Sequence, residues 1–338
     1  MMLRNAWPLM ALLLLMHLCS CAALLGIDPI VTEDLVPPTV DEDPALPSVT
    51  IEVAGRTRAA HYFAEGPAAA PVVLILHGSL SDSRSMLAFR ALADTRRVVF
   101  WDQRGNGLSE RITAEEFTLA SIVEEITAVK ALVSPDAPVT LIGHSFGAMF
   151  ASCYLSQRPD DVERAVLIEP AGLNGSIMAA TMDEMFHLDL LDTGLNELLW
   201  SSETITASSH ATMDYKALQL LANGRLLRYH CDPDHPTPWP VWRPGAQVEV
   251  WRPRLLTDQD GRFDYDFAAG LAECRTPVLL VGTDCSALGA KFQEDHHLAL
   301  FGSVELKEIQ GAGHRVTVEK PDELLIIVRR FLDSPSPR

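Results

Sequence analysis

The chain has 338 residues, of which 48% are hydrophobic and 21% charged, and its formal net charge is −18. This composition is that of a globular protein rather than a disordered one, and the length allows one large domain or two ordinary ones. The acidic balance argues against nucleic acid as a partner, because phosphate binding requires clustered Lys and Arg. It leaves the fold and the substrate open.

The N-terminal segment has the features of a targeting signal. Arg4 precedes residues 6–27, which contain no Asp, Glu, Lys or Arg, and within them LCSC resembles a bacterial lipobox, in which a peptidase cuts before a lipid-modified cysteine. We therefore expect residues 1–20 to be a lipoprotein signal peptide. A lipid on Cys21 would anchor the protein to a bacterial membrane, with its body in the cell envelope outside the cytoplasm. A retained membrane-spanning helix and an ordinary cleaved signal peptide are the alternatives.

The segment that follows is acidic and rich in proline. Residues 28–48 contain five prolines and six acidic residues but no basic residue. Such a segment buries too little apolar surface to fold, and its like charges repel one another. We expect residues 21–48 to form an extended tether that lifts the body off the membrane.

Four cysteines lie beyond the expected signal: Cys153, Cys231, Cys274 and Cys285. Cys274 and Cys285 flank one expected strand, and an extended chain would hold them roughly 30 Å apart, beyond the reach of a disulfide. Cys153 falls on an expected helix and is interpreted as a core residue. The spacing is not that of a disulfide framework, although an oxidising compartment permits disulfides.

Short apolar runs bounded by turn residues alternate with helical patterns through the rest of the chain. The first expected element is a hairpin formed by 49–53 and 59–63. Six further strands are expected at 72–76, 98–101, 139–142, 165–168, 278–281 and 304–309. Helical patterns include 119–132, 146–157 and 321–332. Continuous apolar strands that alternate with helices predict an α/β fold with a mostly parallel sheet covered on both faces. Ligands of such sheets bind beyond the carboxyl ends of the strands.

One serine stands where a strand passes directly into a helix. The sequence LIGHSFGAMF places Ser145 between Gly143 and Gly147. A turn this tight needs small residues around the serine, and it presents the hydroxyl at a helix N-terminus, where backbone N–H groups face a developing negative charge. The pattern predicts a nucleophile, and the alternative is an ordinary serine at a glycine-rich helix start.

Two further motifs follow strands of the same sheet. The sequence HGSL follows the strand at 72–76, and the backbone N–H groups of Ser79 and Phe146 are predicted to form an oxyanion hole. The sequence GAGH lies between the last strand and the last helix, where His314 can serve Ser145 as general base.

The carboxylate that would orient this histidine has two candidates. Asp284 follows the strand at 278–281, thirty residues before His314, and gives the chain order Ser, Asp, His of the α/β-hydrolase fold. We predict Asp284 in this role. Glu169 follows the preceding strand and is the alternative, and the carboxylate that is not used is expected to hold a loop.

These motifs resemble those of a known family. From about Pro71 to its end the chain resembles the α/β-hydrolase superfamily, and FWDQRGNGLSE, LGAKFQEDH and IQGAGH are most similar to the prolyl-iminopeptidase-like branch. The resemblance implies an α/β-hydrolase fold and hydrolase chemistry. Iminopeptidases carry HGGPG where this chain has HGSLS, which argues against peptidase activity. Asp102 and Arg104 are interpreted as a loop-bracing pair.

About 110 residues separate Ile168 from Val278, more than one crossover or a structureless loop requires. They predict a mainly helical cap at 172–272, inserted between the core segments 49–171 and 273–338. Its helical patterns fall at 182–200 and 211–227.

The same insertion contains YHCDPDHP, which offers several possible metal ligands. Nothing else in the chain has metal-ligand spacing, and serine hydrolysis requires no ion. We therefore expect neither a metal nor a cofactor. The pair His296 and His297 is expected at the surface.

The residues predict a serine hydrolase that cleaves a small ester or amide through an acyl-enzyme. A prolyl-iminopeptidase-like aminopeptidase is the alternative enzyme, and it would need cap carboxylates to hold the free amine of its substrate. Four are available: Asp183, Glu184, Asp189 and Glu197. The alternative of another class is a non-catalytic binding protein on the same fold.

Overall fold

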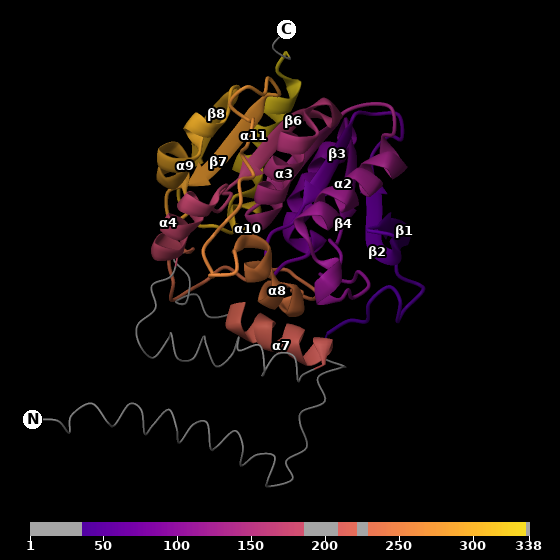
Figure 1. Ribbon diagram of the computed structural model, residues 1–338. Helices are drawn as coiled ribbons and strands as arrows, with labels where there is room; N and C mark the ends of the chain where they lie inside the picture. The colour runs from indigo at the N-terminus through magenta and orange to yellow at the C-terminus, as the bar shows by residue number, and fades with distance from the viewer. Residues whose placement is uncertain (1–35, 186–208, 222–228, 336–338) are drawn as a thin grey trace, which may run out of the picture.

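The computed structural model describes residues 36–185, 209–221 and 229–335 (Figure 1). Within them eight strands form one sheet in the order β1-β2-β4-β3-β5-β6-β7-β8. The strands are β1 (Ser48–Val53), β2 (Arg56–Glu65), β3 (Val72–Leu76), β4 (Arg97–Trp101), β5 (Val139–His144), β6 (Val162–Ile168), β7 (Val278–Thr283) and β8 (Val304–Ile309). The β1–β2 hairpin and the β2–β4 pair are antiparallel, and the other pairs are parallel. The predicted α/β class and mostly parallel sheet are confirmed.

Helices cover both faces of the sheet. In Figure 1, α2 (Leu119–Val133) and α3 (Phe146–Gln157) lie in front of the strands, and one hydrophobic cluster joins them to the sheet. The 3-10 segment η2 (Ser83–Asp94) and α11 (Pro321–Asp333) pack on the opposite face in a second cluster. Shorter helices are η3 (Ala114–Glu116), η4 (Pro159–Asp161), α9 (Ala290–His296), η5 (Leu298–Leu300) and α10 (Val316–Glu319). Because both faces are covered, every residue of β3, β5 and β7 is buried, as their continuous apolar sequences predict.

The insertion between β6 and β7 carries helices over one end of the sheet. Within the described residues these are α4 (Gly175–Met185), α7 (His210–Leu221) and α8 (Ala246–Leu256). Glu249 of α8 accepts hydrogen bonds from Ser79 Oγ (2.5 Å) and Leu80 N (3.3 Å), so α8 lies at the carboxyl end of β3. In Figure 1, α7 lies beside α8 on the side away from the sheet. The expected helices at 182–200 and 211–227 overlap α4 and α7, and their remaining residues lie outside the described part of the chain.

The end of the expected tether packs on the body. Residues 36–42 begin beside the end of α7 in Figure 1, and three of their side chains are buried: Val36, Thr39 and Val40. Val40 N donates to Leu108 O (2.8 Å), and Arg243 Nη1 donates to Pro37 O (3.3 Å). The prediction of an extended tether is wrong for this part, because apolar residues between the prolines supply buried surface.

The expected signal peptide and Cys21 lie outside the described residues. Among the residues that are described, no helix combines the length and the apolar character needed to cross a membrane.

Tertiary packing joins two cysteines that the sequence did not pair. Cys231 and Cys285 form a disulfide with their Cα atoms 4.8 Å apart. Cys231 belongs to the insertion, and no local spacing relates it to the end of β7. Cys153 is buried, as expected of a core residue, and burial raises the pKa of its thiol to about 11. The surface position expected for His297 is wrong, since its side chain is fully buried.

Candidate active site

Ser145 occupies a strained turn between β5 and α3. Its φ is 54° and its ψ −122°, in a region that costs a non-glycine residue roughly 1–3 kcal/mol. A Cβ on Gly143 would lie 2.5 Å from Gly147 O, and a Cβ on Gly147 would lie 2.3 Å from Leu76 O. Both positions therefore require glycine, as the GxSxG spacing predicts. The turn places Ser145 at the N-terminus of α3, where the helix dipole favours negative charge.

His314 lies in the loop between β8 and α10, and its ring contacts a carboxylate. The distance from His314 Nδ1 to Glu169 Oε2 is 2.6 Å, and both side chains are buried. The other oxygen, Oε1, accepts hydrogen bonds from Thr283 N (2.9 Å) and Thr283 Oγ1 (2.5 Å). Glu169 is thus held at both oxygens, and its φ of 44° turns the chain directly after β6.

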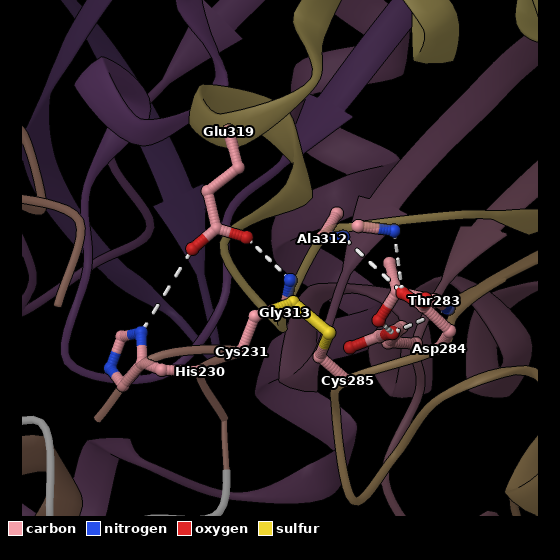
Figure 2. The surroundings of a disulfide bond; sticks show 10 residues. His230, Cys231, Thr283, Asp284, Cys285, Ala312, Gly313 and Glu319 are labelled. Carbon is pink, nitrogen blue, oxygen red and sulfur yellow. Dashed lines mark hydrogen bonds and ion pairs between the residues drawn. A yellow bond between two sulfur atoms is a disulfide. The ribbon is translucent and has the colours of Figure 1, made fainter. Parts of the chain in front are cut away.

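Asp284 contacts the backbone of the histidine loop rather than the imidazole, and Figure 2 shows it near Ala312. Its Oδ1 accepts hydrogen bonds from Gly311 N (2.8 Å) and Ala312 N (3.3 Å), and its side chain is exposed. Desolvation raises its pKa, but the backbone donors, led by Gly311, outweigh this effect and hold the pKa below its ordinary value. The prediction that Asp284 faces His314 is wrong, and Glu169 takes that place. Asp284 instead holds the histidine loop, which is the role expected of the carboxylate that is not used.

His144 connects the serine turn to His314. It immediately precedes Ser145, its Nε2 donates to His314 O (2.8 Å), and the two imidazole rings are 4.5 Å apart. Burial, followed by the charge of His314, holds the pKa of His144 well below its ordinary value. His144 is therefore a neutral donor at physiological pH, and it fixes the backbone of His314 next to the turn.

The HGSL loop follows β3 and touches the serine turn. A Cβ on Gly78 would lie 3.0 Å from Ser145 Cβ, which shows how closely the two segments approach. His77 fixes the start of the loop, since its Nδ1 donates to Gly78 O (2.9 Å) and its Nε2 accepts from Gln103 N (3.0 Å). Burial lowers the pKa of His77. Ser79 and Phe146, the two predicted oxyanion donors, thus both lie next to the serine turn.

A charged pair from the insertion fixes the other end of this loop. Glu249 accepts from Ser79 and Leu80, and it also pairs with Arg252 Nη2 at 2.6 Å. The guanidinium carbon of Arg252 lies 4.2 Å from the centre of the Phe146 ring, a cation–π distance. The sequence did not identify this pair, because acidic and basic residues three apart are common on helices.

Asp102 and Arg104 brace loops, as predicted, although with separate partners. Asp102 is fully buried and accepts from Ser83 N (2.8 Å) and Leu108 N (2.8 Å). Arg104 Nε pairs with Glu125 Oε2 at 3.1 Å. Together they order the segments after β4.

The possible metal ligands of the insertion face different partners. His230 Nδ1 lies 3.9 Å from Glu319 Oε1, whereas His235 pairs with Asp232 at the surface. Among the described residues, Cys231, Asp284 and Cys285 bring ligand atoms within 4.8 Å of one another, but the two sulfurs are joined in the disulfide. A disulfide offers no thiolate to a metal.

Comparison with known proteins identifies the family. The alpha/beta hydrolase fold family matches residues 71–321. The chain belongs to the α/β-hydrolase family. This hydrolase-fold protein is 27% identical over 284 residues to a proline iminopeptidase of Lactobacillus crispatus, across 78% of this chain and 90% of the relative. It is 23% identical over 289 residues to a proline iminopeptidase of Heyndrickxia coagulans, across 84% of this chain and 98% of the relative.

Solved structures share the fold of this α/β hydrolase. A thermophilic esterase from Thermogutta terrifontis aligns with a TM-score of 0.61 at 17% identity, over 84% of this chain and 97% of the esterase. At that identity the likeness shows the fold alone. The sequence matches support the prolyl-iminopeptidase-like branch, in agreement with the FWDQRGNGLSE motif.

Proposed function

We propose that the protein is a serine hydrolase that cleaves a small ester or amide through an acyl-enzyme. Ser145 is the nucleophile, His314 the general base and acid, and Glu169 the carboxylate that orients the imidazole. The observation that carries the proposal is the 2.6 Å contact between His314 Nδ1 and Glu169 Oε2 beside the strained serine turn. When His314 carries its proton on Nδ1, this N–H donates to Glu169. The lone pair on Nε2 is then free to accept the proton of the Ser145 hydroxyl.

The reaction then follows the usual order for such a constellation. Ser145 Oγ attacks the substrate carbonyl while His314 takes its proton, and Glu169 stabilises the imidazolium that forms. The imidazolium returns the proton to the leaving alcohol or amine, which departs and leaves the acyl group on Ser145. Water, activated by the same imidazole, attacks this ester and releases the acid.

The tetrahedral oxyanion would be held by the N–H groups of Phe146 and Ser79. Phe146 is the first residue of α3, where a backbone N–H has no acceptor within the helix. Ser79 belongs to the loop that Glu249 holds against the serine turn. Fixed donors at this point stabilise charge that develops only in the transition state.

The surroundings of Ser79 favour an ester over a substrate with a free amine. Within the described residues, Glu249 is the insertion carboxylate that bonds the HGSL loop, and Arg252 already balances its charge. A substrate ammonium would have to displace that guanidinium. Proline iminopeptidase activity, which the names of the sequence relatives suggest, is therefore the alternative. Two carboxylates considered for amine recognition, Asp189 and Glu197, lie outside the described residues.

The proposal is tested with the full chain in detergent micelles. We expect hydrolysis of p-nitrophenyl esters and labelling by a fluorophosphonate probe, and both should disappear in Ser145→Ala with the circular dichroism spectrum retained. Faster turnover of L-prolyl p-nitroanilide than of the esters would instead favour the aminopeptidase. A folded wild type that neither turns over nor is labelled would support the non-catalytic binding protein.

We also propose that a lipid on Cys21 anchors the hydrolase to a bacterial membrane, with its catalytic body in the cell envelope outside the cytoplasm. The support is the lipobox-like LCSC sequence at the end of an uncharged apolar stretch. The substrate would then be a small molecule that reaches the envelope.

A further inference from the structure

The loop that carries His314 is held on one side by residues that follow β7. Asp284 Oδ1 accepts from Gly311 N at 2.8 Å and from Ala312 N at 3.3 Å. Cys285 N donates to Ala312 O at 3.2 Å. These bonds fix the first half of the loop against the sheet.

The second half of the loop is held by a segment of the insertion. His314 N donates to Tyr229 O (2.7 Å), and the Tyr229 ring stacks on the imidazole with centroids 4.3 Å apart and planes inclined by 27°. A Cβ on Gly313 would lie 1.9 Å from Tyr229 O, so that position requires glycine. Glu319 accepts from Gly313 N and faces His230 (Figure 2). The segment 229–231 thus contacts both the backbone and the ring of the histidine, in addition to the bonds from His144 and Glu169.

The disulfide joins these two sides. Cys231 is two residues from Tyr229, Cys285 directly follows Asp284, and the bond between them bridges 54 positions of sequence. In the view of Figure 2, Asp284 and Ala312 appear on one side of the disulfide, and His230 and Glu319 appear on the other. The histidine loop is therefore enclosed by two segments that a covalent bond holds together, which we name the histidine clamp (residues 229–231 and 284–285).

We propose that the Cys231–Cys285 disulfide positions the imidazole of His314, and that its reduction by a dithiol slows turnover without unfolding the protein. The inference rests on the proposed function, in which His314 is the base for Ser145. A misplacement of about 1 Å can cost a reaction on the order of a hundredfold, so a small release of Tyr229 is sufficient. Tyr229 and the two cysteines are positioning residues, because they act through the histidine.

The chemistry of the reduction is accessible. Cys231 is exposed and Cys285 is partly exposed. A dithiol such as dithiothreitol supplies two electrons and two protons, so that the sulfur–sulfur bond breaks, Cys231 and Cys285 become thiols, and the reductant closes to a cyclic disulfide. The buried cluster residues that join the sheet to its helices include neither cysteine, so the core can outlast the bond.

The test compares the oxidised full chain with the same chain treated with dithiothreitol, and with Cys231→Ser/Cys285→Ser. For a p-nitrophenyl ester, we expect kcat to fall at least about tenfold in both altered forms, while KM changes less than about twofold. The double variant should be insensitive to dithiothreitol. Cys274→Ser, which removes a cysteine outside the clamp, should behave as wild type, including its response to the reductant.

Hydrogen–deuterium exchange tests the clamp without a substrate. Reduction should speed exchange of the backbone amides at 311–314, while amides of β5 and α3 keep their protection. Unchanged exchange at 311–314, or faster exchange with an unchanged kcat, would overturn the proposal. If the oxidised chain neither hydrolyses esters nor reacts with a fluorophosphonate, the proposed function is wrong. The effect of the disulfide on kcat is then wrong as well, because it requires that function. Faster exchange would then identify the clamp as structural only.

Discussion

Glu169 and His314 meet through a 2.6 Å contact although 145 residues separate them, and the carboxylate comes from the end of β6 rather than β7. β6 lies between β5, which leads to Ser145, and β7. A carboxylate at this point reaches the histidine from the strand next to the one that leads to Ser145. Two variants separate its role from that of Asp284.

Glu169→Gln should lower kcat by at least roughly a hundredfold with KM little changed, because a triad carboxylate fixes the histidine tautomer and stabilises the imidazolium. Asp284→Asn is the matched control. It should lower the melting temperature, since Asp284 holds Gly311 and Ala312, and affect kcat less. Kinetics of both variants on one p-nitrophenyl ester decide the matter, and a large loss in Asp284→Asn with an active Glu169→Gln would reverse the assignment.

Glu249→Ala should slow ester hydrolysis roughly tenfold, because the HGSL loop loses the carboxylate that holds Ser79 and Leu80. If Glu249 acts only on this loop, the loss should be the same for substrates with and without a free amine. The measurement is kcat/KM for L-prolyl p-nitroanilide and its N-acetyl derivative. A loss confined to the free amine would assign Glu249 to amine recognition and favour the aminopeptidase.

The buried His297 should make the fold sensitive to acid. Its Nδ1 donates to Gln293 Oε1 (2.7 Å), its Nε2 accepts from Leu173 N (3.3 Å), and burial lowers its pKa to about 3. As the pH falls, His297 of the unfolded chain binds a proton with a pKa near 6.5, before His297 of the folded chain does. The stabilisation is therefore complete above that pH and is lost toward pH 3, at up to about 1.4 kcal/mol per pH unit.

His297→Gln tests this dependence. The variant should be less stable near neutral pH. Its free energy of unfolding should nevertheless fall less steeply between about pH 6 and pH 4.5, with a slope smaller by up to about 1.4 kcal/mol per pH unit, which corresponds to one proton. Urea denaturation over that range measures both slopes. Equal slopes in the variant and the wild type would show that His297 does not titrate in this way.

Cys21→Ser should abolish lipid attachment and leave the precursor uncut by the lipoprotein peptidase. Mass spectrometry of the N-terminus, with metabolic labelling by a fatty acid, measures both effects in cells. Cys19→Ser, two positions earlier in the same apolar stretch, is the control and should still be processed. An unmodified N-terminus in the wild type would rule out the anchor and leave a spanning helix or an ordinary signal peptide.

The strands could be predicted closely because every residue of β3, β5 and β7 is buried, and burial on both faces produces a mostly apolar run in the sequence. The serine turn could be predicted for a similar reason, since only glycine fits beside it. The choice between Glu169 and Asp284 could not be predicted from the sequence. The two residues follow neighbouring strands, and the direction of each side chain depends on the turn after its strand. Glu249, Arg252 and Cys231 come from the insertion, whose position relative to the sheet depends on tertiary packing.

The docked segment at 36–42 determines where the chain can be trimmed. Arg243, which holds Pro37, also pairs with Asp214 of α7 at 2.9 Å, and Asp214 in turn accepts from Ala246 N at the start of α8. Removal of everything before Ser48 would uncover this buried ionic group and the apolar surface under Val36 and Val40. A protease or an engineered truncation that removes residues 36–47 should therefore lower the stability of the body.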